Sequence, residues 1–435
     1  MSSTRALDPL GRILTGSRSP LADPRELAAV SGALYPVLTL LVRLPQTMVP
    51  LGVLTTVALV SGSPALGALC AGAVTLGSSV CGLGMGAAAS YRRRQAGLVL
   101  VALANPVVIW WLVGLLPERS AAGDPDAVGL VLPCLLTGLV LPQMGVVCRL
   151  RWWSLLEHHR REDLADTALR YESIMDSLAT VLAAAVTGLV AVTLGPLAVL
   201  ALGAALTLVG SGAILLHRSA RLPPALIRFL PDSPRPPTRA ARQRRRRARV
   251  VWLLPVAGMG ALGSLLGSIL GSVVVFATSV DAVVSVSWMY AVTGLTSTAA
   301  AVFAAARARD VRRWNRWVVA SAGAVLASML LSLPDDSVGM VVVLAIAGLT
   351  TGPSLVAVYE IARLVAPSAR VTVLTTVMTA AMGLGLTVGL VLSGWWGESW
   401  GYRSAALLPV GSAAVLLATA LAFVHRWRRR GPAAG

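Results

Sequence analysis

The sequence is dominated by twelve long apolar runs, separated by charged or turn-forming residues. A helix needs about 20 apolar residues to cross the ~30 Å hydrocarbon core of a bilayer. Of the 435 residues, 56% are hydrophobic and only 13% charged, which leaves too few polar groups to cover a soluble domain. We therefore predict an all-α integral membrane protein with twelve transmembrane helices. The expected spans are residues 34–60, 65–89, 96–116, 127–148, 171–194, 196–216, 250–277, 282–306, 317–333, 338–361, 371–394 and 404–424.

The basic residues predict the orientation of these spans. All 37 are Arg, and 34 of them fall in cytoplasmic segments if the amino terminus is cytoplasmic. The expected outer loops contain only Arg119 and Arg403. Because cytoplasmic loops carry the excess of basic residues, this distribution predicts a multi-pass protein of the cytoplasmic membrane with both termini inside.

The spans form two groups of six. Spans one and seven begin about 217 residues apart, and the same offset superposes Arg92 on Arg309. Two similar six-span halves are typical of transporters built from repeats. The expected organisation is a cytoplasmic tail (1–33), a first six-helix bundle (34–216), a linker rich in Arg and Pro (217–249), a second six-helix bundle (250–425) and a second cytoplasmic tail (426–435).

The linker contains an uninterrupted basic cluster from Arg244 to Arg247. Such a cluster could bind nucleic acid, dock a partner protein or lie against anionic lipid headgroups. No aromatic residue interleaves the cluster to stack on bases, so we favour the lipid surface over nucleic acid. The expected partners are the lipid bilayer and a small-molecule substrate, without nucleic acid, and the expected assembly is a monomer.

Residues that commonly carry catalysis or bind metals do not form productive patterns. The four Cys fall in or at the ends of apolar spans, and the four His lie beside Arg in cytoplasmic segments. Neither set has metal-ligand spacing, and the chain has no Ser-His-Asp arrangement or phosphate-binding loop. We therefore expect neither an enzyme nor a bound metal or cofactor.

Arg43 is the clearest functional candidate, because it lies within the first expected span. Nine residues at 1.5 Å each place it ~14 Å inside the cytoplasmic face, near the middle of the bilayer. From that depth a cavity-facing or ion-paired side chain is favoured over one that snorkels to the surface. Asp176, near the start of span five, could pair with Arg43 or could cap its own helix.

Two other spans contain polar candidates. Gln143 follows Pro142 in span four, where a broken backbone hydrogen bond could help line a cavity or could simply accompany a packed kink. In span ten, Tyr359 and Glu360 are candidates for cavity residues. Glu360 also has the i,i+3 spacing to pair with Arg363, and this local pair is slightly favoured.

Several short motifs resemble an actinobacterial branch of the major facilitator superfamily of secondary transporters. They are Arg43-Leu-Pro-Gln-Thr-Met48, Leu141-Pro-Gln-Met-Gly145, Tyr171-Glu-Ser-Ile-Met-Asp176 and the segment from Gly352-Pro353 through Tyr359. The resemblance covers nearly the whole chain and implies the major facilitator fold, two pseudo-symmetric six-helix bundles. It also adds Gln46, within the first motif, to the candidate cavity residues.

The loop after span two departs from this family. The superfamily pattern Gly-x-x-x-Asp-Arg-x-Gly-Arg-Arg fits best when it starts at Gly86. Ser90 then stands at the Asp position, and this chain retains only the basic part of the pattern, in Arg92 and Arg94. These four residues are the candidates for a cytoplasmic gate loop. Asp310 and Arg313, in the corresponding loop of the second half, complete that set.

The leading hypothesis is a secondary transporter that works by alternating access. The resemblance implies export of a small molecule, since this branch is associated with drug-like efflux. A cavity cation such as Arg43 would favour an anionic or polar group on the solute. The alternative, motivated by the degenerate gate loop, is a transport-inactive protein of the same fold that acts as a scaffold or interaction partner.

Overall fold

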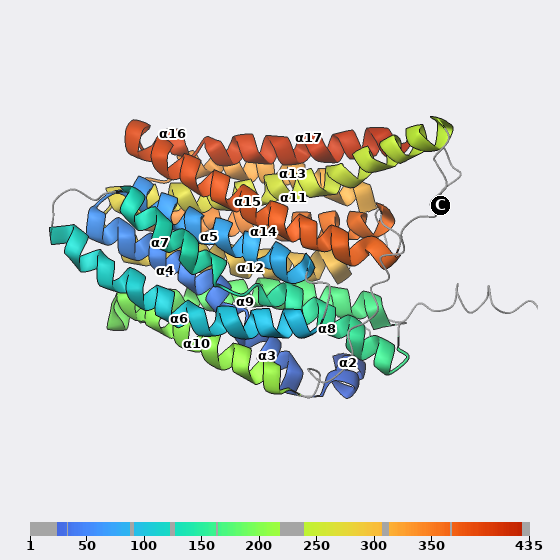
Figure 1. Ribbon diagram of the computed structural model, residues 1–435. Helices are drawn as coiled ribbons and strands as arrows, with labels where there is room; N and C mark the ends of the chain where they lie inside the picture. The colour runs from blue at the N-terminus through green and yellow to red at the C-terminus, as the bar shows by residue number, and fades with distance from the viewer. Residues whose placement is uncertain are drawn as a thin grey trace, which may run out of the picture.

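The computed structural model describes residues 24–32, 34–87, 91–121, 127–161, 164–217, 239–306, 313–365 and 368–428. All regular structure in these ranges is helical, and the long helices run side by side in a bundle (Figure 1). The first half contains α2 (Pro24–Ser31), α3 (Leu34–Leu41), α4 (Leu44–Ser61), α5 (Pro64–Ala87), α6 (Tyr91–Ala121), α7 (Ala127–Leu139), α8 (Met144–His158), α9 (Ala165–Leu194) and α10 (Pro196–Leu216). The second half contains α11 (Arg239–Ser279), η3 (Val283–Ser285), α12 (Val286–Ala306), α13 (Arg313–Met329), η4 (Leu330–Ser332), α14 (Ser337–Val365), α15 (Ser368–Trp400), α16 (Tyr402–Ala405) and α17 (Leu408–Arg428).

The expected all-α membrane fold is confirmed, with one qualification on the number of spans. Eleven helical segments among the described residues are long and apolar enough to cross a membrane. The ninth expected span, 317–333, coincides with α13, whose 17 residues fall short of that length. The 3₁₀ turn η4 extends this helix to Ser332.

The two ends of the bundle differ in charge. One end, the basic end, holds α2, the Arg-rich first turns of α11 and the last turn of α17, which contains His425, Arg426 and Arg428. This end lies at the right of Figure 1, and α16 lies at the opposite end. α11 begins at Arg239, inside the predicted linker, while 218–238 and the tails 1–23 and 429–435 lie outside the described residues.

Two expected spans are each divided by a break in the helix. Between α3 and α4, the chain turns at Val42 and Arg43, and Pro45 in the first turn of α4 has no N–H to continue the ladder. Between α7 and α8 the break covers 140–143, where Gln143 has a non-helical ψ of 81°. Pro142 lacks an N–H and disfavours the helical region for the residue before it, which accounts for this second break.

Glycine brings helices of the second half into backbone contact. A Cβ at Gly267 in α11 would lie 2.1 Å from the carbonyl oxygen of Leu386 in α15, and one at Gly389 would lie 2.1 Å from that of Ser264. α12 and α14 meet in the same way, since a Cβ at Gly352 would lie 1.9 Å from the carbonyl oxygen of Ser297. Small residues permit this close approach of helices in a membrane, where apolar burial alone does not drive packing.

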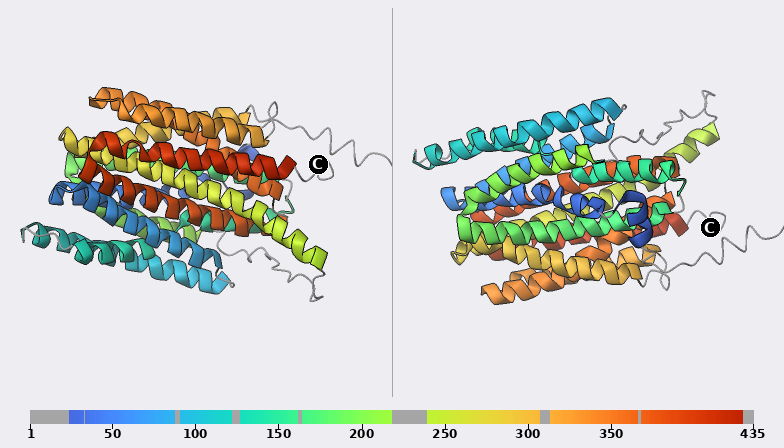
Figure 2. Two further views of the ribbon diagram at one scale, coloured as in Figure 1. Left: turned by 90° about the horizontal axis from the view of Figure 1, so that it is seen from above. Right: turned by 90° about the horizontal axis from the view of Figure 1, so that it is seen from below.

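The two halves share one apolar core toward the opposite end. The largest buried cluster belongs mainly to α11–α17 but includes Leu51 and Leu54 of α4, Ala68 of α5 and Ala184 of α9. These residues lie in the parts of α4, α5 and α9 that are remote from the basic end. The halves are therefore packed together toward the opposite end. The two further views show the long helices of both halves running side by side (Figure 2).

Candidate functional site

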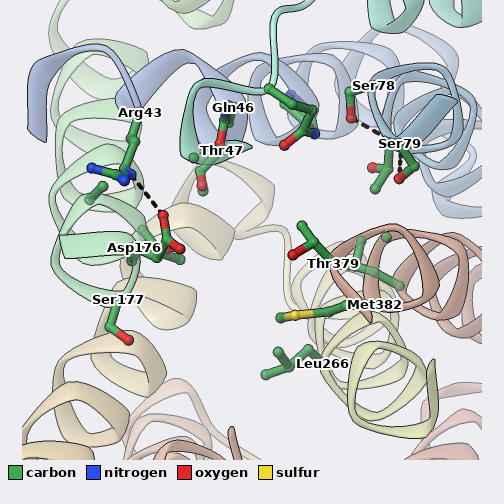
Figure 3. A pocket seen from close by; sticks show the side chains of 18 of the residues that line it. Arg43, Gln46, Thr47, Ser78, Ser79, Asp176, Ser177, Leu266, Thr379 and Met382 are labelled. Atoms are coloured by element: carbon green, nitrogen blue, oxygen red, sulfur yellow. Dashed lines mark hydrogen bonds and ion pairs between the residues drawn. The ribbon is translucent and has the colours of Figure 1, made fainter. Parts of the chain in front are cut away.

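A cavity of about 270 Å³ lies between the two halves. Its wall comes from α4, α5, α8 and α9 on one side and from α11, α12, α14 and α15 on the other. Figure 3 shows Arg43 and Asp176 together on one side of this space, with Thr379 and Met382 across it. Of the residues predicted to line a cavity, Arg43, Gln46, Gln143, Asp176 and Tyr359 all do so.

Arg43 is held at the break between α3 and α4. Its guanidinium donates from Nη1 to the carbonyl oxygen of Thr39 at 2.9 Å and from Nη2 to Oε2 of Glu172. Its Nε lies 2.7 Å from Oδ1 of Asp176, an ion pair without the alignment of a hydrogen bond. Two carboxylates therefore compensate the charge of Arg43, and only 1% of its side chain is exposed.

Glu172 is the buried carboxylate of the charged cluster that it forms with Arg43 and Asp176. Its second oxygen, Oε1, accepts a hydrogen bond of 2.8 Å from Nε1 of Trp152 in α8. Next to it, the hydroxyl of Tyr171 lies 3.3 Å from Oγ1 of Thr39. These contacts join α3, α8 and α9. The sequence analysis did not select Glu172, because nothing in a linear pattern shows that α9 crosses the chain at Arg43.

Asp176 stands on the cavity side of the same cluster. The two roles considered for it were pairing with Arg43 and capping its helix; the structure places it well inside α9, in the pair. Its side chain is 35% exposed, in contrast to 3% for Glu172. Asp176 is therefore the carboxylate that a molecule in the cavity would meet.

The two glutamines connect the broken helices. Nε2 of Gln46, in the first turn of α4, donates 3.1 Å to the carbonyl oxygen of Pro142, which lies in the break between α7 and α8. Gln143 caps the start of α8 without a side-chain cap hydrogen bond. A Cβ at Gly82 of α5 would lie 2.8 Å from Cγ of Gln143, so the glycine provides room for this side chain.

Arg149 is a second cation of the cavity wall, and the sequence analysis missed it. Its Nε donates to the carbonyl oxygen of Gly145 at 3.0 Å, and its Nη2 donates to Oγ1 of Thr379 at 3.3 Å. Tyr359 lies 3.3 Å from the same Thr379 hydroxyl. Arg149 thus links α8 of the first half to α15 of the second. It was expected just beyond span four, but α8 continues to His158 and places it within a long apolar segment.

Arg149 and Asp176 are close neighbours. A Cβ at Gly145 would lie 3.3 Å from both Nη2 of Arg149 and Oδ1 of Asp176. The missing side chain of Gly145 therefore leaves space in which the two charged groups approach each other. Asp176 is thus near the guanidinium group of Arg149 as well as that of Arg43.

Glu360 lies elsewhere. Its Oε2 accepts a hydrogen bond of 2.9 Å from Nη1 of Arg316 in α13, and it is not among the residues that line the cavity. This ion pair within the second half is half-buried, at 12% and 18% exposed side chain. The side chain of Arg363, the local partner considered from the sequence, is outside the described part.

The predicted gate loops fall mostly outside the described residues. Ser90 and Asp310 belong to the ranges that the structure does not describe. Gly86 lies in the last turn of α5, Arg92 and Arg94 lie in the first turn of α6, and Arg313 begins α13, but their side chains are not described. Their role in a gate stays a prediction.

Glu398 joins the two halves at the opposite end. Its Oε2 accepts from Oγ of Ser63 at 2.7 Å and from the backbone N–H of Ala65 at 2.9 Å. Oγ of Ser63 also accepts from the N–H of Leu66 at 3.1 Å, so both side chains cap the start of α5. A Cβ at Gly394 would lie 2.4 Å from that of Ala68, which shows how closely α15 packs beside this cap.

The described residues contain no group of three or more His, Cys, Asp or Glu that could hold a metal ion. The four cysteines, Cys70, Cys81, Cys134 and Cys148, are free thiols. The polar part of the cavity wall consists of charged groups, amides and hydroxyls.

The fold matches solved structures of membrane transporters. No protein-family model and no curated protein sequence matches this chain. The nucleoside transporter NupG has 16% identity and a TM-score of 0.59, covering 91% of this chain and 99% of that one. An auto-inhibited peptide transporter of the POT family has 16% identity and a TM-score of 0.60, covering 91% and 96%. The human organic anion transporter MFSD10 (TETRAN) has 14% identity and a TM-score of 0.58, covering 92% and 100%.

These three structures are of transporters rather than enzymes, in line with the expectation from the sequence. Identities this low show a shared fold and leave the substrate of this chain open. The actinobacterial branch suggested by the short motifs stays a prediction. The match over nine-tenths of the chain, together with the two helical halves around one cavity, shows that the protein has the major facilitator fold.

Proposed function

We propose that the protein is a secondary transporter that carries a small molecule across the cytoplasmic membrane by alternating access. The observation that supports this most is the cavity between the halves, whose wall takes helices from both and contains buried charges. Charged groups inside a membrane are costly and mark solute or ion pathways. A site at the interface of two repeats is where transporters of this architecture bind their solutes.

The distribution of Arg supports a cytoplasmic basic end and an extracellular opposite end. Under this assignment, the shared apolar core and the Glu398 cap close the extracellular side. The conformation described here then corresponds to the inward-facing state of the transport cycle. Export, the direction that the family resemblance implies, would load the solute from this side.

Flux measurements in proteoliposomes test the proposal. The purified protein is reconstituted and exposed to a panel of neutral, zwitterionic, anionic and cationic solutes under imposed pH and solute gradients. We expect saturable flux of at least one class, reduced at least about tenfold by Arg149→Ala, which removes a cavity donor but not the buried Arg43–Glu172 pair. Arg403→Ala, at an exposed ion pair of the opposite end, serves as the matched control and leaves flux unchanged.

Absence of flux for every class, in protein that remains folded and monodisperse, would favour the scaffold alternative. The direction is tested in right-side-out and inverted vesicles with the same solute. Export predicts accumulation in inverted vesicles. Accumulation only in right-side-out vesicles would show import instead.

A further inference from the structure

We infer that the cavity binds a solute without net charge, which presents N–H or O–H groups to the cavity wall. The inference deepens the proposed function and rests on it in assigning the cavity to the transported solute. It follows from how the four ionised groups of the site are arranged and from how the hydroxyls around them are already bonded. Neither observation depends on the identity of a similar protein.

The first pair of charges is closed to the cavity. Arg43 and Glu172 have side chains that are 1% and 3% exposed. Each group also bonds to a further protein atom, Arg43 to the carbonyl oxygen of Thr39 and Glu172 to the indole N–H of Trp152. This pair therefore holds α3, α8 and α9 together but cannot exchange its partners for a solute without opening the helix packing.

The other two charged groups, Arg149 and Asp176, face the cavity and have opposite charges. Arg149 and Asp176 both line the space, and both approach within 3.3 Å of the same point beside Gly145. Asp176 is in addition 2.7 Å from Nε of Arg43. The cluster therefore contains two guanidinium groups and two carboxylates, and its formal charge is zero.

This balance decides which solutes fit. Among the described residues, no other charged side chain lines the cavity. An ion that left water for this space would lose its hydration without gaining an uncompensated counter-charge, which is unfavourable for either sign. The anion preference expected from Arg43 alone disappears once its two carboxylates are counted. A neutral polar molecule has a much smaller desolvation cost and can still bond to the exposed edges of Arg149 and Asp176.

The hydroxyls of the wall define the complementary groups. Several of them already donate to carbonyl oxygens of their own helix at 2.8 to 3.1 Å, namely Thr75, Ser79, Thr298 and Thr351. A hydroxyl has one proton to donate but two acceptor lone pairs. With the proton used in the helix, each oxygen is left as an acceptor. A solute with N–H or O–H donors satisfies such a wall better than one with acceptors alone.

A matched set of small probes tests this in the purified full-length protein. Benzamide, benzoate and benzylamine have the same ring and differ chiefly in charge, and N,N-dimethylbenzamide lacks the N–H donors. Binding is measured by isothermal titration and by the concentration dependence of thermal stabilisation. We expect benzamide to bind about tenfold more tightly than either ion, and more tightly than its dimethyl derivative. Tighter binding of either ion, equal binding of the two amides, or no binding by any probe would overturn the inference.

Charge variants should switch the preference in opposite directions. Asp176→Asn leaves the cluster with one excess positive charge and is expected to favour benzoate. Arg149→Gln leaves one excess negative charge and is expected to favour benzylamine. The double variant restores neutrality and is expected to favour benzamide again, an outcome that simple loss of a contact would not produce.

A second position keeps the test decisive if the Asp176→Asn or the Arg149→Gln variant fails to fold. Gln143 lines the cavity and makes no side-chain cap bond, so Gln143→Glu and Gln143→Lys add opposite charges without removing an ion pair. We expect the first to favour benzylamine and the second benzoate. Identical preferences in both variants would contradict the charge-balance argument. These binding measurements need no flux, so their failure is distinct from failure of the transport proposal.

Discussion

Arg43 and Glu172 compensate each other's charge in a place that is almost inaccessible to water. Both side chains are almost fully buried, and their contacts reach α3, α8 and α9. Removing one member of a buried ion pair leaves an uncompensated charge, which typically costs about 3–5 kcal/mol. Under the proposed function, Arg43 chiefly anchors the broken first span, while Arg149 and Asp176 present their charges to the cavity.

This assignment predicts a specific pattern of stability. Arg43→Met should lower the stability of the folded protein by about 3 kcal/mol, because Glu172 stays buried without its counter-charge. Arg43→Met combined with Glu172→Gln should recover most of the loss, since both charges are then absent. Thermal unfolding in detergent, with refolding checked, measures the stability of the single and the double variant. A double variant less stable than the single one would show that Arg43 contributes mainly by packing.

The same residues show what a sequence can reveal at this scale. An Arg deep in an apolar run is visible without a structure, because its charge is out of place there. Its main partner Glu172 and the second cation Arg149 were not visible, since both lie near expected span boundaries and look like ordinary interfacial residues. Their position depends on how far α8 and α9 extend as helices and on where these helices cross α3.

At the scale of single elements, the apolar runs predicted well which helices exist and roughly where each begins and ends. Length and hydropathy are local properties, and a spanning helix satisfies all its backbone groups within itself. The breaks at Arg43 and Gln143 were only partly foreseen: Pro142 suggested a kink, but Pro353 lies inside the continuous helix α14. Whether a proline interrupts a helix depends on neighbours that re-satisfy the freed carbonyls, and these are tertiary contacts.

The close glycine contacts predict the positions at which helix packing does not tolerate an added side chain. Gly267→Ala in α11 should destabilise the protein by at least about 2 kcal/mol, because its Cβ would lie 2.1 Å from the backbone oxygen of Leu386. Gly260→Ala, in the same helix, is the matched control. Its Cβ would make an ordinary contact of 3.6 Å with the oxygen of Ala381. Equal unfolding temperatures for the two variants would contradict this account of the α11–α15 interface.

The Glu398 cap predicts how strongly α5 and α15 are held at the opposite end. Glu398→Ala removes two hydrogen bonds across the halves and should shift the equilibrium toward separation there, by about 0.5–2 kcal/mol. Spin labels at Thr193 and Ser399 report this distance, which we expect to lengthen. Asp336→Ala is the control, since Asp336 caps Gly339 within one half. An unchanged distance in the Glu398 variant would show that apolar packing alone closes this end.

At the scale of the whole molecule, the two halves enclose one cavity, and a shared apolar core packs them together toward the opposite end. The Arg distribution predicts an orientation, because topology follows the charges of the loops, and this orientation stays a prediction. The conformation could not be predicted in this way. It depends on contacts between halves, such as those of Leu51 and Glu398, that a second conformation would replace.

Paired distances across the halves in lipid nanodiscs test alternating access most directly. One pair of spin labels, at Thr193 and Ser399, reports the opposite end, and another, at Glu157 and Leu364, reports the basic end; the four native cysteines are replaced by alanine. We predict two populations in which one distance lengthens as the other shortens, with Glu398→Ala favouring the form open at the opposite end. A single fixed distance at both ends, unaffected by Glu398→Ala, would contradict transport by alternating access.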